Sequence, residues 1–159
     1  MNQRTRAARG WLRAAVALGA MLAAPAVGAQ QVPELLMAVS GSPGTLRIQG
    51  AVAGEDPTPV ADNSTTYTIT VSVPNAKITA HLDAPMPSGV TLAVTLAAPP
   101  GATSLSQVPL DATPRDVVTG LGITTGSTHS ITYHLSATVA AGVVPLQARS
   151  VTLTLAALP

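Results

Sequence analysis

The alternation of apolar residues with hydroxyl-bearing ones is the feature of this chain that most constrains its fold. A period of two belongs to the β-strand, in which successive side chains point to opposite faces. An antiparallel sheet with one buried face and one solvated face requires such a pattern. In the clearest segment, Tyr67, Ile69, Val71 and Val73 share one face, and Thr68, Thr70 and Ser72 share the other.

The same alternation recurs along the chain and predicts an all-β fold. Residues 78–83, 91–96, 131–139 and 151–155 show it clearly, and residues 46–52, 107–110 and 115–121 show it more weakly. Segments rich in Gly and Pro separate them, at residues 54–63, 85–89, 99–101, 120–127 and 140–145. Seven to eight short strands with this punctuation are typical of an antiparallel β-sandwich.

The N-terminus has the pattern of a secretory signal peptide covering residues 1–29. Four arginines lie within the first 13 residues, an apolar run extends from Ala14 to Val27, and small residues precede a cleavage site after Ala29. A membrane anchor is the less favoured interpretation, because the run is shorter than the roughly 20 residues of a spanning helix and contains Pro25. The chain has no cysteine that could accept a lipid. We therefore expect a secreted, periplasmic or cell-surface protein from a bacterium, without a membrane span in the mature chain.

After the signal peptide we predict a flexible segment, residues 30–45, and one sandwich domain, residues 46–159. The first segment shows no clean period, so it is either a mobile arm or a poorly marked first strand. Residues 46–52 alternate through Leu46, Ile48 and Val52. Two roles for this stretch stay open: the first strand of a closed sandwich, or a donor strand that pairs with a neighbouring subunit.

Composition excludes several classes of function. The predicted mature part contains all seven acidic residues but only four of the eight basic ones, so it carries no surface suited to neutralising phosphates. The single Trp, Trp11, lies in the signal peptide, which leaves Tyr67 and Tyr133 as the only aromatic residues of the mature chain. Stacking platforms for bases are therefore absent. We expect no nucleic-acid partner.

Searches for catalytic motifs find no Gly-x-Ser-x-Gly elbow, cysteine nucleophile, phosphate loop or His-Glu-x-x-His sequence. We therefore expect no enzymatic activity and no cofactor. His81, Asp83 and His134 have the ligand types of a zinc or copper site if their strands are neighbours, but ordinary solvated strand faces are the strongly favoured interpretation. His129 lies five residues before His134, so a regular strand points the two in opposite directions. We assign no catalytic, cofactor-binding or metal-binding residue.

The acidic residues suggest local roles. Asp83, Asp111 and Asp116 are too scattered for a paired general acid and base, and turn capping is the favoured role. The acidic loop with Glu55, Asp56 and Asp62 lacks the ligand spacing of a calcium-binding loop. The glycosylation pattern 63–65 is interpreted as a chance match, since the signal peptide looks bacterial.

At this level of pattern the chain resembles bacterial secreted immunoglobulin-like domains. Residues 66–73, 77–82 and 149–155 carry the resemblance. Within this group the chain is most similar to chaperone–usher fimbrial subunits and to spore-coat-protein-U domains. The resemblance implies an immunoglobulin-like antiparallel β-sandwich that assembles by strand donation between subunits. The cysteine pair of many such subunits and the aromatic residue near a pilin C-terminus are both missing.

Two functional hypotheses follow from these observations. The first is an exported, non-enzymatic surface or extracellular protein with a structural or interaction role, such as a fimbria-like subunit, whose partners are other protein subunits bound through edge-strand pairing. The second is a free-standing periplasmic or secreted binding module, with a surface metal-binding protein as its weakest form.

Overall fold

The computed structural model describes residues 32–50 and 52–158, which belong to one compact unit spanning Val32–Pro159. The predicted signal peptide, residues 1–29, lies outside the described residues and stays a prediction. All the strands among the described residues belong to one of two sheets, and neighbouring strands in each sheet run antiparallel.

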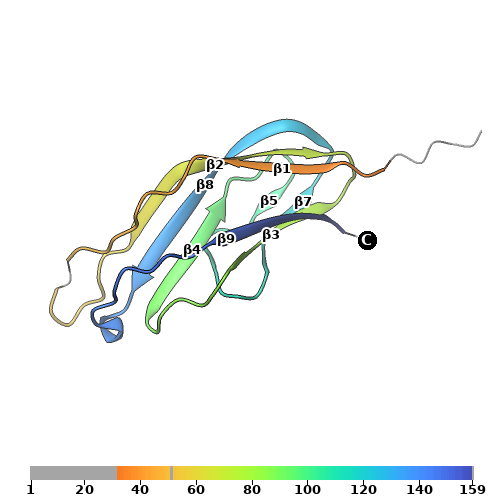
Figure 1. The fold of residues 1–159 in the computed structure, drawn as a ribbon. Coiled ribbons are helices and arrows are strands. Elements are labelled where there is room, and N and C mark those ends of the chain that lie inside the picture. The colour runs from red at the N-terminus through yellow and green to blue at the C-terminus, as the bar shows by residue number, and fades with distance from the viewer. Residues whose placement is uncertain (1–31, 51, 159) are drawn as a thin grey trace, which may run out of the picture. The chain divides into compact units, whose positions relative to one another are not determined.

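The two sheets pack face to face and form a β-sandwich (Figure 1). Sheet A has the order β1 (Leu35–Ser40), β2 (Val60–Val71), β8 (Thr124–Ala137), β4 (Val90–Leu96) and β6 (Val108–Pro109). Sheet B has the order β5 (Thr103–Ser104), β7 (Arg115–Leu121), β3 (Ala76–Leu82) and β9 (Val151–Ala157). One short 3-10 turn, η1 (Val139–Ala141), follows β8. The predicted all-β sandwich is confirmed; β6 lies within the weakly marked segment 107–110, and the two-residue strand β5 was not expected.

The strand order fits an immunoglobulin-like sandwich. In that fold one sheet holds strands A, B, E and D, and the other holds C, F and G. The succession β1, β2, β8, β4 reproduces the first sheet, while β3 and β9 take the positions of C and F. No strand of the described residues takes the position of G beside β9, so β9 is an edge strand.

The inward-facing residues of both sheets form the core, as the alternation predicts. Most of each clearly alternating segment lies in a strand, and its apolar residues are buried or partly buried between the sheets, except Val139, which follows β8 and is exposed. Central members are Tyr67, Ile69 and Val71 of β2, Ile78, Ala80 and Leu82 of β3, Leu92, Val94 and Leu96 of β4, Val117, Val118 and Leu121 of β7, and Ile131 and Tyr133 of β8.

The N-terminal part of the domain differs from the predicted boundaries. Residues 30–45 do not form a flexible segment throughout, because β1 lies within them and pairs with β2 from Leu35↔Val71 to Ser40↔Thr66. Of the two alternatives for this stretch, the poorly marked first strand is correct. Its pattern is poorly marked because Leu36, which faces solvent with 56% of its surface exposed, is as apolar as its inward-facing neighbours.

The prediction that residues 46–52 form the domain's own first strand is wrong, because residues 46–50 and 52 belong to an irregular loop between β1 and β2. The donor-strand alternative concerns pairing with another subunit and stays a prediction. Gly50 has a φ of +100°, outside the range of an extended strand, and Val52 is 66% exposed. The sandwich therefore begins with β1, upstream of the predicted boundary at residue 46.

Two strands also extend into predicted turns. β2 begins at Val60, inside the expected turn 54–63, and β8 begins at Thr124, inside the expected turn 120–127. A bulge between Asp62 and Thr65 interrupts the pairing of β2 with β8. A bulge adds a residue and shifts the register, which obscures the period of two in the sequence.

Tyr67 offers a test of the core that uses pH. Its hydroxyl donates a hydrogen bond to the carbonyl of Ala97 (2.5 Å), and burial raises its pKa from 10 to about 12. The pKa of Tyr67 is higher in the folded state than in the unfolded state. The neutral phenol therefore makes its full contribution to the free energy of unfolding below pH 10, and this contribution is lost between pH 10 and about 12. We expect the free energy of unfolding of the wild type, measured with urea, to fall more steeply over this window than that of Tyr67→Phe.

Tyr67→Phe also serves as its own control near neutral pH, where loss of one hydrogen bond costs about 1 kcal/mol. Tyr133, whose pKa is also raised by burial, is present in both proteins and cancels in the comparison. Parallel losses of stability in the two proteins above pH 10 would contradict the buried, neutral phenol.

Candidate functional site

The structure does not bring the three candidate metal ligands together. His81 lies on the outer face of sheet B, between the buried Ala80 and Leu82 of β3, and Asp83 follows that strand. His134 lies on the outer face of sheet A, where it is paired with Ala93 of β4. The two histidines thus face away from each other on opposite sides of the sandwich. In the part of the chain that is described, no group of three His, Cys, Asp or Glu residues is arranged to hold a metal ion.

His129 points inward, opposite to His134, as its spacing predicts. Its Nε2 lies 2.5 Å from the hydroxyl of Ser127, and its ring lies 5.7 Å from the ring of Tyr67. Ser127 and His129 share one strand and one face. Among the described residues no carboxylate is hydrogen-bonded to this histidine, so the pair lacks the group that orients the base in a catalytic triad.

The acidic side chains are engaged in local bonds. Asp83 accepts bonds from the backbone N–H groups of Ala84 and Ser150, each at 3.0 Å, which is the expected turn-capping role. Asp111 caps Thr113 at 2.8 Å and also pairs with Arg115, whose hydrogen bond lowers the pKa of the carboxyl. Asp116 instead forms an ion pair of 2.8 Å with Lys77.

The acidic residues at the start of β2 and in the loop before it are likewise used for structure. Asp62 accepts hydrogen bonds from the hydroxyl and the backbone N–H of Ser64, and these bonds lower its pKa. Asp56 accepts a bond of 2.9 Å from the N–H of Val139, which ties the loop to η1. The two carboxylates therefore serve separate contacts rather than one calcium site.

The free edge of β9 is the strongest candidate for a functional site. Hydrogen-bonded pairs alternate with non-bonded pairs along an antiparallel ladder. The bonds Ser150–Asp83 and Leu158–Asn75 at the two ends of the β3–β9 pairing show that even-numbered residues of β9 bond to β3. The N–H and C=O groups of Val151, Leu153, Leu155 and Ala157 therefore point away from β3, toward the unoccupied side.

β1 forms a second free edge with the same properties. The bond from the N–H of Ser72 to the carbonyl of Glu34 shows that even-numbered residues of β1 bond to β2. The backbone groups of Leu35, Met37 and Val39 are directed to the free side. The β1 and β9 edges run along the same side of the sandwich and approach each other across it (Figure 1).

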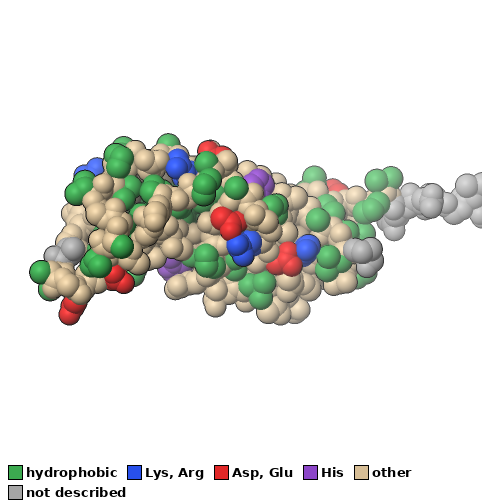
Figure 2. All heavy atoms as spheres, turned by 90° about the horizontal axis from the view of Figure 1, so that it is seen from below, with side chains coloured by type: hydrophobic (Ala, Val, Ile, Leu, Met, Phe, Trp, Pro, Cys, Tyr) green, Lys and Arg blue, Asp and Glu red, His purple; other side chains and the backbone are tan. Residues whose placement is uncertain are grey.

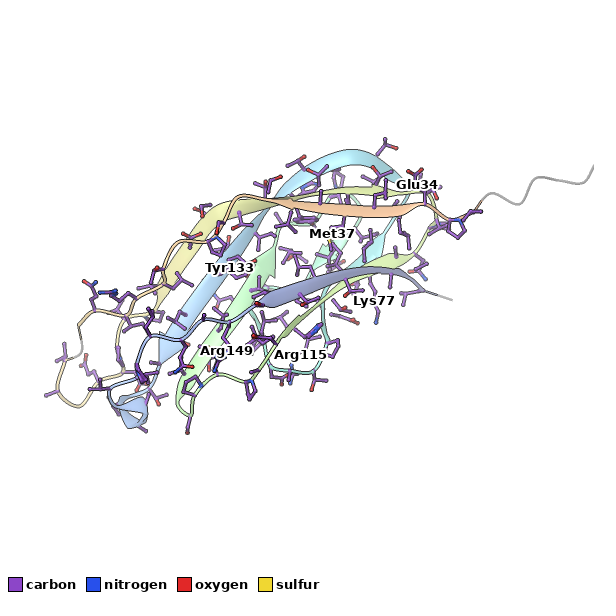
Figure 3. The ribbon with its side chains drawn as sticks, viewed as in Figure 1. Glu34, Met37, Lys77, Arg115, Tyr133 and Arg149 are labelled. Carbon is purple, nitrogen blue, oxygen red and sulfur yellow. The ribbon has the colours of Figure 1, made fainter. Side chains whose placement is uncertain are left out.

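Both edges lack the residues that normally prevent strand addition. Natural sheets protect their edges with charged side chains, prolines or bulges. The sequences of β1, LLMAVS, and of β9, VTLTLAA, contain none of these residue types. Met37 points from β1 toward the interior between the sheets, as labelled in Figure 3, and it packs against the core together with Leu153 and Leu155 of β9.

The surface around the edges carries few charges. Charged residues make up 9% of the sequence, well below the roughly 25–35% typical of a designed soluble surface. In Figure 2 the acidic and basic side chains form small groups separated by wide uncharged areas. Electrostatic repulsion between copies of this chain is therefore weak.

The alternation of residues 151–155 predicts the strand β9, but no pattern in the sequence marks either edge as a site. The signal that was present for β9 is a run of seven residues without charge or proline near the end of the described chain. For β1 the signal is weaker, because the stretch that contains it, residues 30–45, shows no clean period of two.

Comparison with known proteins adds no assignment. No family model matches the chain, and neither a curated protein nor a solved structure matches it. Within the described residues no helix is long and apolar enough to span a membrane.

The edge geometry predicts an alternating pattern of amide exchange in the dilute protein. We expect the N–H groups of Leu153 and Leu155 to exchange with deuterium faster than those of Thr152 and Thr154, which bond to β3. On β1 the N–H of Met37 should exchange faster than that of Ala38. Uniform protection along β9 in a monomer, measured by NMR, would contradict the open edge.

Proposed function

We propose that this protein is an exported, non-enzymatic structural or interaction protein of a bacterial surface, and that its partners are other protein subunits bound through edge-strand pairing. The observation that carries the proposal is the pair of unprotected edges, β1 and β9, on one side of the sandwich. Strand addition to such an edge supplies main-chain hydrogen bonds, and alternate side chains supply specificity.

The arrangement of the two edges favours assembly of many subunits over a closed pair. When the β9 edge of one copy pairs with the β1 edge of another, the two copies contribute different surfaces, which is a heterologous contact. Such contacts repeat from copy to copy and produce filaments or rings. Pairing in this sense is the behaviour of a fimbria-like subunit, which the resemblance of residues 66–73, 77–82 and 149–155 also suggests. Export from the cell rests on the N-terminal pattern in residues 1–29.

A free-standing binding module in the same compartment is the second candidate. The observation that favours it is an apolar cavity at one end of the sandwich, described in the next subsection. The two candidates differ in one measurable property, since a binding module of this kind functions as a monomer.

Charges placed on the β9 edge should test the assembly. In the double variant Thr152→Lys/Thr154→Lys both substitutions are at exposed positions on the outer face of β9. Charged side chains, lysines above all, on an edge strand oppose the addition of a further strand. We expect the wild type to form oligomers as its concentration rises, and the double variant to self-associate about tenfold more weakly. Light scattering coupled to size-exclusion chromatography measures both.

A matched control carries the same two charges on a strand that is paired on both sides. Thr66→Lys/Thr68→Lys places two lysines with the same spacing on the outer face of β2, where these residues pair with β1 on one side and with β8 on the other. We expect this control to assemble like the wild type. A wild type that stays monomeric at all concentrations, or equal weakening in both variants, would exclude edge pairing and favour the binding module.

A further inference from the structure

Sheet A is longer than sheet B, and its end is covered by loops. β8 has 14 residues and β2 has 12, whereas β3 and β9 have 7 each. At the far end of sheet A, Val90 pairs with Ala137 and Leu92 with Leu135. The inward side chains at this end meet irregular segments around residues 46–50, 57 and 141–147 instead of strands of sheet B.

These segments leave a cavity of about 530 Å³ against the end of sheet A. Cavities that hold small molecules have volumes of about 300–1,000 Å³ and walls that are mostly apolar, with a few polar groups. This cavity lies in that range of volume and its lining is more apolar than polar, although it is partly open to solvent; no residue of sheet B lines it. Its apolar lining consists of Leu46, Ile48, Pro57, Met86, Val90, Leu135, Ala137, Ala141, Val144, Pro145 and Leu146.

Specific contacts hold the walls of the cavity in place. Asp56 binds the N–H of Val139 at 2.9 Å, and the N–H of Thr138 donates to the carbonyl of Gly89 at 2.8 Å. Gly89 has a φ of +75°, and a Cβ at this position would lie 2.9 Å from the backbone nitrogen of Ala141. The loop before β4 and the turn after β8 can approach this closely only because residue 89 is glycine.

Arg47 is the single charged residue that lines the cavity. The other polar side chains of the lining belong to Thr138 and Gln147, and no acidic residue contributes. The ion pairs of the described residues are Lys77–Asp116 and Arg115–Asp111, so the guanidinium of Arg47 has no carboxylate partner there. An apolar cavity with one unpaired cation at its wall is complementary to an apolar chain that ends in one anion.

We propose that this cavity binds a small amphipathic monocarboxylate, with its hydrocarbon chain against Leu46, Val90 and Leu135 and its carboxylate at Arg47. Burial of methylene groups supplies the binding free energy, because they leave water for an apolar environment. The guanidinium supplies selectivity for the anionic group, since it donates hydrogen bonds in a geometry that matches a carboxylate. The proposal goes beyond edge assembly, because a polymer subunit and a monomer carry the same cavity.

Decanoate is a suitable probe, and decan-1-ol and decyltrimethylammonium are its neutral and cationic counterparts. We expect decanoate to shift the NMR signals of Val90, Ala137 and Val144, and to bind more tightly than the other two compounds. Arg47→Gln should weaken decanoate binding by about fivefold, the effect of a partly exposed charge pair, and leave decan-1-ol binding unchanged.

Arg115→Gln is the matched control, because it removes the same charge at the start of β7, which does not line the cavity. It should bind decanoate like the wild type. Ala137→Trp should fill the cavity and abolish binding of both decanoate and decan-1-ol, and thermal melts should verify that each variant is folded. No shift at the cavity residues, or equal losses in Arg47→Gln and Arg115→Gln, would overturn the proposal and leave the assembly experiment unaffected.

Discussion

The pairing of β2 with β8 is the interaction on which the rest of the structure depends. These are the two longest strands, and they pair from Val60↔Leu135 to Val71↔Thr124. The pairing brings Tyr67 and Ile131 into the centre of the core and gives β1 its only hydrogen-bonded neighbour. On its other side β8 carries β4, so every strand of sheet A is attached directly or indirectly to this pair. The same two strands are also longer than the strands of sheet B, and the loops cover the end of sheet A that extends beyond sheet B.

The chain combines an ordinary apolar core with an unusual surface. Small aliphatic residues fill the interior around two tyrosines, and Thr and Ser cover the outer strand faces. Hydroxyl groups keep these faces wet without adding charge. With so few charges on these faces, electrostatic repulsion does little to limit association. Association is limited instead where the backbone N–H and C=O groups are already hydrogen-bonded within a sheet. The two open edges are therefore the places where this surface has the least protection, which is why they carry the functional proposal.

The strands with regular alternation could be predicted from the sequence, because a period of two depends only on which face is buried. β3 is the clearest case: Ile78, Ala80 and Leu82 are buried, and the residues between them face outward. β1 could not be predicted in this way, since Leu36 is apolar although it faces solvent. The stretch from Leu46 to Val52 misled for the opposite reason, because its apolar residues alternate while the backbone at Gly50 leaves the extended region.

The candidate sites were harder to predict than the strands, for a topological reason. Whether β9 is an edge depends on which strands flank it, and its neighbour β3 lies about 70 residues earlier in the chain. The separation of His81 from His134 also depends on the assignment of their strands to different sheets. The cavity arises from a mismatch in length between two sheets, which no local pattern records. Local roles such as the capping by Asp83 were predictable, because they involve residues near a turn.

The pairing of β3 with β9 also has a consequence for the time course of folding. Residues 76–82 cannot complete their side of sheet B until residues 151–157 are available, so the β3–β9 ladder closes only after almost all of the described chain has been synthesised. Folds dominated by such distant pairings form slowly, typically in milliseconds to seconds. The backbone groups of β3 that β9 later pairs with therefore stay without that partner until residues 151–157 have been synthesised.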